Sequence, residues 1–136
     1  MIRYRTTPDG LREEQLSGFF VGWPNPPAPA THLRVLEGSD HVALALNEDE
    51  RVIGFATAIT DGVLTAYVPL LEVLPDYRGE GVGRELVRRL LGQIGRLYSI
   101  SLHCDPELEG FYESLGLRRL GGMAVRNFDA QAGRSH

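Results

Sequence analysis

The strongest constraint on the fold is a long apolar segment that runs through a short turn into a segment with helical periodicity. Val63–Leu74 is almost continuously apolar, which predicts a strand buried on both faces and central in a sheet; Glu72 is the conspicuous exception. From Val82 the apolar residues at 82, 86, 87, 90, 91 and 94 follow the 3.6-residue period. The sequence therefore predicts a buried strand joined to an amphipathic helix.

The turn between these two elements is rich in glycine and reads Arg78-Gly79-Glu80-Gly81-Val82-Gly83. Glycines let a backbone approach an anion closely, and the N–H groups and dipole of a helix N-terminus favour phosphate. A tight turn without a ligand would use the same residues, because short glycine motifs also occur by chance. Rossmann spacing would need glycine at Arg84 or Leu86, and the Walker motif needs a lysine, which this chain lacks.

The patterns around this unit predict an α/β fold with a mixed, mostly antiparallel sheet flanked by helices. Further strands are predicted at Ile2–Arg5, His41–Leu46, Arg51–Thr60, Tyr98–His103 and from Leu117 onward. Helices are predicted at Leu11–Phe20, Pro29–Glu37 and Pro106–Leu115. The 136 residues fit one domain over 1–128, followed by a polar C-terminal tail, 129–136.

The composition argues against several partners and reactions. The net charge is −4 and the 14 basic residues are scattered, so no nucleic-acid footprint is visible. All 14 are arginine, which excludes Schiff-base chemistry on lysine. No apolar run approaches the roughly 20 residues of a membrane-spanning helix, which predicts a soluble protein without a membrane partner.

Met1–Arg5 lacks the apolar core of a secretory signal, and the single cysteine, Cys104, cannot form an internal disulfide. Both features favour the cytoplasm, and the oligomeric state is left open with a homodimer as one option.

The glycine turn resembles the signature Q/R-x-x-G-x-G/A of the Gcn5-related N-acetyltransferase (GNAT) superfamily, which follows a long central strand. A second segment, Cys104–Leu117, resembles the family's N-x(6)-Y-x-x-x-G-F block, with Asp105 for the usual Asn and Leu117 for Phe. The two segments have the family's separation and extend the resemblance from about residue 41 to 121. Gly18–Pro27 looks like a subgroup of small single-domain bacterial members.

This resemblance implies the acyl-CoA N-acyltransferase fold, in which the central strands splay apart. It also implies direct transfer of an acetyl group to an amine acceptor, with acetyl-CoA as co-substrate. A strand-end backbone N–H near Val73 would stabilise the oxyanion. The residues that match the family's acetyl-CoA site are Leu71, Val73, Arg78, Gly79, Gly81, Val82, Gly83, Arg84 and Asp105.

The resemblance assigns the catalytic acid to Tyr112, whose phenol would protonate the leaving thiolate. The alternative is an ordinary aromatic residue on a helix face. Glu72 is the leading candidate for the base that takes the amine's proton, because desolvation in an apolar strand would favour its neutral form. The alternative for Glu72 is a structural carboxylate paired with arginine. Asp61 and Asp105 are weaker candidates, since turn and cap carboxylates are usually structural.

The other reactive side chains are interpreted as structural. Cys104 is predicted to be a buried small hydrophobe rather than a nucleophile that carries the acetyl group. His32, His41 and His103 lack metal-ligand spacing, so no metal site is predicted and these histidines are expected to face solvent or be hydrogen-bonded. Two other functions stay open. A non-catalytic acyl-CoA-binding module would keep the turn without using Tyr112, whereas a nucleotide-binding domain fits poorly.

Overall fold

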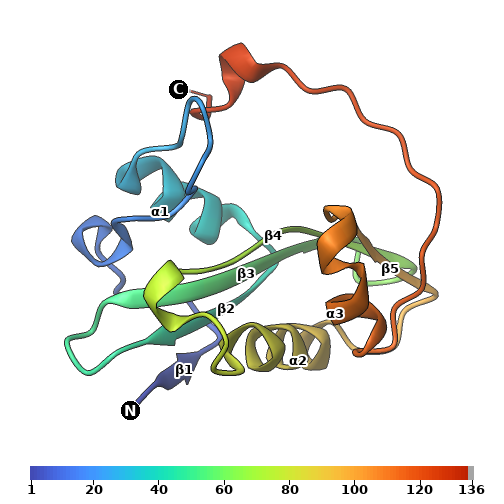
Figure 1. The fold of residues 1–136 in the computed structure, drawn as a ribbon, viewed down its shortest axis with the longest axis horizontal. Coiled ribbons are helices and arrows are strands. Elements are labelled where there is room, and N and C mark those ends of the chain that lie inside the picture. The colour runs from blue at the N-terminus through green and yellow to red at the C-terminus, as the bar shows by residue number, and fades with distance from the viewer. Residues whose placement is uncertain (135–136) are drawn as a thin grey trace.

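The computed structural model describes residues 1–134 as one mixed sheet with helices around it (Figure 1). The strands lie side by side in chain order, and they are β1 (Arg3–Arg5), β2 (His41–Leu46), β3 (Val52–Thr60), β4 (Thr65–Val73) and β5 (Ser99–Leu102). The first four are antiparallel, whereas β5 joins β4 in parallel. The predicted mixed, mostly antiparallel sheet flanked by helices is confirmed.

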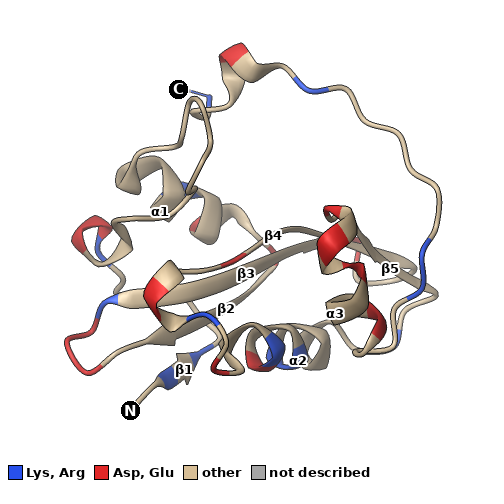
Figure 2. Cartoon of the chain, viewed as in Figure 1, with Lys and Arg blue, Asp and Glu red and all other residues tan. Residues whose placement is uncertain are grey.

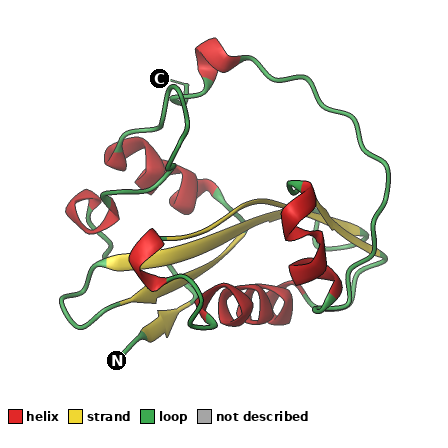
Figure 3. Cartoon of the chain, viewed as in Figure 1, coloured by secondary structure: helices red, strands yellow, loops and turns green. Residues whose placement is uncertain are grey.

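Helices cover both faces of this sheet (Figure 3). Helix α1 (Pro29–Gly38) and the short 3-10 helix η1 (Glu13–Leu16) pack together on one face. Helix α2 (Val82–Ile94) lies on the other face against β2, β3 and β4, with the short helix α3 (Glu109–Glu113) beside it. A Cβ on Gly54 of β3 would lie 3.0 Å from Leu86 and 3.3 Å from Val82, so glycine permits this close helix–strand approach.

The strand buried on both faces is β3 rather than β4. Val52–Ala58 is fully buried, whereas burial along β4 alternates at first and is partial from Leu70 onward. The prediction of a doubly buried strand over Val63–Leu74 is therefore wrong, although a strand does form there. The reason is that β5 pairs with only the first four residues of β4 and leaves the rest of that strand without a neighbour on one side.

Three predicted elements differ from the structure. Leu11–Phe20 contains only the single 3-10 turn η1, because Gly18 and Phe20 both adopt positive φ, +93° and +63°. Pro106–Leu115 divides into a 3-10 turn, η3 (Pro106–Leu108), and the short helix α3. No strand follows Leu117 within the described residues, and the chain instead runs extended and exposed to a 3-10 turn, η4 (Phe128–Ala130).

The predicted C-terminal tail contacts the body of the protein as far as it is described. Asn25 donates from its backbone N–H to the Gln131 side chain (2.8 Å), and Arg34 donates to the Arg134 carbonyl (2.8 Å). Residues 135–136 of that tail lie outside the described part.

Charged residues of both signs are spread over the loops and helix surfaces (Figure 2). Among the described helices, none has the length and apolar character needed to span a membrane.

Candidate active site

The site begins where β4 loses its parallel neighbour. The last pair between the two strands is Val68 with Leu102, and the next residue of β4 is Pro69, which has no N–H to donate. The register between β3 and β4 also shifts here, so that Val68 and Pro69 together oppose one residue of β3. Proline in a sheet is typically found at such bulges. The split between β4 and β5 therefore has a local cause in the sequence.

Beyond the bulge, β4 presents to the gap backbone groups that have no strand partner. The Leu74 N–H donates to the Ile53 carbonyl (2.8 Å), so Leu74 is one of the residues whose polar groups point toward β3. Because alternate residues of an antiparallel strand direct their polar groups to opposite sides, Leu71 and Val73 direct theirs away from β3. Both residues were predicted to bind acetyl-CoA, and the structure places their N–H and C=O groups on the open side of the strand.

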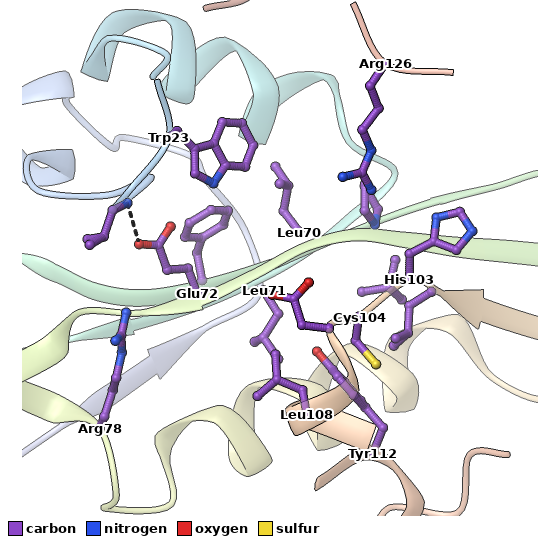
Figure 4. A pocket seen from close by; sticks show the side chains of 16 residues that line it. Trp23, Leu70, Leu71, Glu72, Arg78, His103, Cys104, Leu108, Tyr112 and Arg126 are labelled. Atoms are coloured by element: carbon purple, nitrogen blue, oxygen red, sulfur yellow. Dashed lines mark hydrogen bonds between the residues drawn. The ribbon is translucent and has the colours of Figure 1, made fainter. Parts of the chain in front are cut away.

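A cavity of about 420 Å³ occupies the gap. Its walls come from the open part of β4, the end of β5, the segment that leads into α3, and the loop before α1. The residues that line it include Trp23, Leu70, Leu71, Glu72, Arg78, His103, Cys104, Asp105, Leu108, Tyr112 and Arg126. Figure 4 shows Trp23 and Arg126 on one side of the β4 ribbon, and Leu108 and Tyr112 on the other. The cavity therefore connects the two faces of the sheet.

The glycine turn lies at the N-terminus of α2, next to the open end of β4. Gly79 and Gly81 have φ of +82° and +83°, and no atom lies within 4 Å of where a Cβ would stand on either. Both residues are exposed, and Gly81 is the N-cap of the helix. Such a turn leaves the first helical N–H groups free to bind an anion. Gly83, two residues further, approaches Phe111 of α3 and Val73 of β4.

The three other predicted residues of this segment have different surroundings. Arg78 donates from Nε to the Val73 carbonyl (2.9 Å), which ties its exposed side chain to the end of β4. Val82 is buried in the core with 2% exposure, so only its backbone can reach a ligand. Arg84 donates to the Ser114 hydroxyl (2.8 Å) and thereby links α2 to the end of α3.

Tyr112 projects from α3 into the cavity, where Figure 4 shows its hydroxyl directed toward the open part of β4. The side chain is buried, and its ring meets that of Phe111 edge to face at 5.0 Å. Burial, with a smaller effect of Cys104, raises the pKa of Tyr112 to about 12. The phenol therefore keeps its proton throughout the neutral range and can act as a donor in the cavity.

Glu72 lines the same cavity but is also a hydrogen-bond acceptor for the backbone of a distant loop. Its Oε1 accepts from the Phe20 N–H (2.8 Å) and its Oε2 from the Val21 N–H (3.3 Å). No ion pair between Glu72 and arginine is present in residues 1–134, so the alternative of a carboxylate paired with arginine does not hold. Phe20 has a positive φ that is uncommon for a non-glycine residue, and Glu72 helps to hold it.

Cys104 and Asp105 lie between β5 and α3 at the cavity wall. Cys104 is partly exposed rather than buried, which corrects the prediction, because β5 has already ended. Desolvation and the nearby carboxylate of Glu109 raise the pKa of its thiol, so the nucleophilic thiolate is disfavoured. Asp105 is exposed and caps η3 only through its carbonyl, which accepts from the Leu108 N–H (2.9 Å).

Asp61 is a turn residue, as predicted. Its Oδ1 accepts from the N–H groups of Val63, Leu64 and Thr65, and these bonds hold the pKa of its carboxyl below the usual value. Asp61 is absent from the residues that line the cavity. A structural role accounts for these contacts.

The histidines are only partly as predicted. His103 is exposed, and its Nδ1 lies 3.0 Å from the Tyr67 hydroxyl. His32 is 1% exposed, and neither ring nitrogen has a hydrogen-bond partner, so the expectation of a solvated or hydrogen-bonded ring is wrong for this residue. The cause is an aromatic cluster, Phe19, Phe20 and Phe55, that surrounds the ring. No group of three or more metal-binding side chains occurs in residues 1–134.

Among the cavity-lining residues that sequence reasoning missed are two from segments outside the sheet and α3. Trp23 comes from the proline-rich loop before α1, where its ring packs on Phe20 with the centroids 4.8 Å apart. Arg126 comes from the extended C-terminal segment, which was expected to be a strand. The tryptophan in a rigid loop was a usable signal, whereas nothing local in the sequence marks Arg126.

A mostly antiparallel sheet whose parallel fifth strand diverges from the fourth, with a glycine turn beside the split, defines the acyl-CoA N-acyltransferase fold. The family model described as the acetyltransferase (GNAT) family matches residues 9–117. The chain therefore belongs to the GNAT family, and the resemblance in the sequence is confirmed.

One similar solved structure is a crystal structure from Deinococcus radiodurans, which carries a provisional assignment as an acetyltransferase. It is 47% identical, has a TM-score of 0.97, and covers 99% of this chain and 94% of its own. GCN5-related N-acetyltransferase 1, chloroplastic, from Arabidopsis thaliana is 28% identical over 82% of this chain and 59% of its own length. Serotonin N-acetyltransferase 2, chloroplastic, from Oryza sativa is 38% identical over 61% and 44%. The chain thus spans three fifths or less of these two curated relatives.

Proposed function

We propose that this chain transfers the acetyl group of acetyl-CoA directly to an amine. The observation that carries the proposal is the open edge of β4, where Leu71 lines the cavity that Tyr112 enters and Val73 directs its backbone groups to the same side of the strand. The glycine turn lies at the end of the same strand. A ligand with a diphosphate at one end and amides along its length suits these two features together.

The acetyl-CoA site is proposed on the backbone of β4 and of the turn. The N–H and C=O groups of Leu71, and the lone pair of the Val73 carbonyl that Arg78 leaves free, suit the pantetheine amides as a neighbouring strand would, because both residues lack a strand partner on that side. The N–H groups of Gly79, Gly81, Val82 and Gly83 suit the diphosphate at the positive end of α2. The rim of this site is formed by Arg78, Arg84 and Asp105, whose side chains would contact acetyl-CoA.

The chemistry proposed for the cavity needs three groups. The N–H of Val73 donates to the oxygen of the thioester carbonyl as negative charge develops there. Glu72 accepts the proton that the attacking amine loses when its nitrogen bonds to the carbonyl carbon. Tyr112 donates its proton to the sulfur as the carbon–sulfur bond breaks, so that free CoA thiol leaves. Trp23 and Arg126, on the other side of β4, would contact the acceptor.

The direct test is to mix the protein with acetyl-CoA and a panel of aromatic and aliphatic amines, and to measure the thiol released. We expect at least one amine to support turnover. Acetyl-CoA, unlike ATP and NAD, should raise the Tm, because only a ligand of the folded state stabilises it. Stabilisation by acetyl-CoA with no turnover on any amine would instead indicate a binding module.

Tyr112→Phe tests the proposed acid, because it keeps the ring and its packing and removes only the hydroxyl. General acid catalysis typically contributes ~10²–10⁴-fold, so kcat should fall by about that factor. The Tm shift produced by acetyl-CoA should be nearly unchanged. Full kcat in this variant, with chemistry shown to limit turnover, would remove Tyr112 from the mechanism. Phe111→Leu, a change at the neighbouring ring, is the matched control and should retain a measurable rate.

A further inference from the structure

The part of the cavity proposed for the amine lies on the face of the sheet that α1 covers. Phe55 of β3 stands opposite Glu72 of β4, and directly opposed residues of neighbouring strands project their side chains to the same face. Phe55 packs against His32 of α1, so the Glu72 side chain also lies on that face. Figure 4 shows Trp23 and Arg126 on this side of β4. The acceptor side therefore combines a carboxylate, an indole ring and a guanidinium.

The two charged groups of this side do not neutralise each other. Within residues 1–134 no ion pair joins Glu72 to Arg126. The Glu72 carboxylate accepts from two backbone N–H groups, whereas the Arg126 guanidinium has no hydrogen-bond acceptor in the described chain. Arg78 at the same cavity wall differs, because its Nε donates to the Val73 carbonyl. Arg126 therefore brings a set of unused cationic donors to the cavity.

A chain of contacts ties the segment of Arg126 to this carboxylate. The Phe20 N–H donates to Glu72 (2.8 Å), and the Phe20 ring packs on Trp23 with the centroids 4.8 Å apart. Two residues after Trp23, the Asn25 side chain donates to the carbonyl that lies two residues after Arg126 (3.1 Å). The positions of the carboxylate, the indole and the guanidinium therefore depend on one another.

An exposed arginine by itself needs no protein partner, because water satisfies its donors. Arg126 differs from such a residue in two respects: it lines a cavity, and its segment is fastened to the loop that forms another wall of that cavity. Arg118 lies on the same C-terminal segment and is equally exposed, but it is not among the residues that line the cavity. Arg118 is therefore the natural comparison for Arg126.

Opposite charges in one cavity select a ligand by the charges that it carries. The amine of an acceptor arrives protonated and is attracted to the Glu72 carboxylate. Arg126 repels a second positive charge and attracts an oxyanion, to which a guanidinium can donate two parallel hydrogen bonds. Leu70 is two residues before Glu72 and thus on the same face, and Figure 4 shows it between Trp23 and Arg126. The site suits an amine joined to an oxyanion by an apolar spacer.

The oxyanion belongs to the acceptor rather than to acetyl-CoA. The diphosphate of acetyl-CoA is proposed at the N-terminus of α2, which covers the opposite face of the sheet from α1 (Figure 3). Figure 4 shows Leu108 and Tyr112 on that opposite side of β4. Arg126 is therefore separated by the strand from the groups proposed for the coenzyme.

We propose, resting on the acetyl transfer proposed above, that the acceptor is an amine that also carries a carboxylate or a phosphate, and that Arg126 binds this oxyanion. The amine nitrogen bonds to the acetyl carbon and gives a proton to Glu72, while the carbon–sulfur bond breaks and Tyr112 gives a proton to the sulfur. The oxyanion takes no part in these bond changes. Its contact with Arg126 holds the amine beside Glu72 and sets the specificity for the acceptor.

Three matched pairs of amines test the charge preference through the thiol released from acetyl-CoA. The pairs are γ-aminobutyrate with butylamine, para-(aminomethyl)benzoate with benzylamine, and phosphoethanolamine with ethanolamine. The first two place a carboxylate on an aliphatic or an aromatic spacer, and the third presents a phosphate. In at least one pair, kcat/KM for the anionic member should exceed that for the neutral member about tenfold or more.

Substitutions at Arg126 then assign the preference to its charge. Arg126→Gln should lower the ratio of kcat/KM between the two members about tenfold. Arg126→Glu should reverse the preference, so that the diamine putrescine becomes a better acceptor than γ-aminobutyrate. Arg118→Gln and Arg118→Glu make the same changes outside the cavity and should keep the wild-type ratio. Acetyl-CoA should raise the Tm of every variant equally; a smaller rise in Arg126→Gln would assign the guanidinium to the coenzyme and overturn the proposal.

Calorimetric binding of the same pairs to the protein saturated with CoA separates this proposal from the proposed reaction, because binding needs no turnover. Tighter binding of anionic members that depends on Arg126, without thiol release from any amine, would refute acetyl transfer and support the ligand class. Turnover that is as fast on every neutral amine as on its anionic partner, or a preference that survives Arg126→Gln, would overturn the ligand class and leave acetyl transfer standing. Neither turnover nor binding with any pair would overturn both.

Discussion

The buried imidazole of His32 should make the stability of this protein depend on pH in the mildly acidic range. The ring lies 4.3 Å from the Phe55 ring and 4.9 Å from the Phe20 ring, between centroids, and neither nitrogen has a hydrogen-bond partner. Desolvation in this apolar cluster lowers the pKa of His32 from 6.5 to about 4. The unfolded chain therefore binds a proton between these values that the folded chain does not.

The sign and size of the effect follow from linkage. Between pH 4 and 6.5 the unfolded state binds more protons than the folded state. The free energy of unfolding therefore rises with pH over that window and falls as the pH is lowered. Relative to pH 8, the lowered pKa of His32 reduces the free energy of unfolding by about 3 kcal/mol at pH values below 4. At pH 5 the reduction is about 2 kcal/mol. Glu85, whose pKa its bonds to Arg88 and Arg89 hold at about 2, titrates below this window.

Urea unfolding of wild type and His32→Leu at pH 5 and pH 8 measures the effect. Wild type should lose about 2 kcal/mol more than His32→Leu between these conditions, because the variant has no buried imidazole to protonate. His103→Gln is the matched control, since that ring is exposed, and it should keep the wild-type dependence. If His32→Leu loses as much stability as wild type on acidification, the buried-neutral description of His32 is refuted.

Substitutions at three positions probe the candidate active site. Gly81→Asp should abolish the Tm shift produced by acetyl-CoA, whereas Gly81→Asn should keep it, because both side chains tolerate positive φ but only one opposes phosphate with charge. Cys104→Ala should retain most of kcat if transfer is direct, and a competent acetyl-Cys104 intermediate would contradict this. Glu72→Gln should lower the free energy of unfolding by about 1–2 kcal/mol, because an amide NH₂ would face the Phe20 or Val21 N–H. The same variant should lower kcat by at least ~10²-fold if Glu72 is the base, and unchanged kcat would leave only the structural role.

The elements that sequence predicted well are those whose pattern depends on local geometry. Strand β2 has the predicted bounds, and α2 begins at Val82 as its period requires. Leu11–Phe20 failed because its apolar spacing is compatible with a helix, while its actual shape depends on Glu72, more than 50 residues away. Tertiary contacts of this kind leave no local signal.

The C-terminal segment shows a different limit. The residues after Leu117 predict a strand, yet the single chain forms none there within residues 1–134. A strand needs a neighbour, and a sequence pattern does not say whether that neighbour belongs to the same copy. Arg126 was missed at the cavity wall for a similar reason, because its place there depends on contacts with residues outside its own segment.

Glu72 joins the two halves of the candidate active site into one unit. Its neighbours in β4, Leu71 and Val73, face the open edge proposed for acetyl-CoA, while its own carboxylate holds the Phe20–Val21 backbone of the loop that carries Trp23. The hydrogen bonds to Phe20 and Val21 occupy one side of the carboxylate, and the oxygens have further lone pairs for a proton from the cavity. From the sequence alone, a base and a structural carboxylate were alternatives for Glu72, but this geometry allows both.

Substitutions at Trp23 should therefore change the KM for the amine with little effect on acetyl-CoA affinity, because Trp23 lies across β4 from the proposed thioester side. Loss of both affinities together would mean that the loop and the strand edge do not act as separate walls of one cavity.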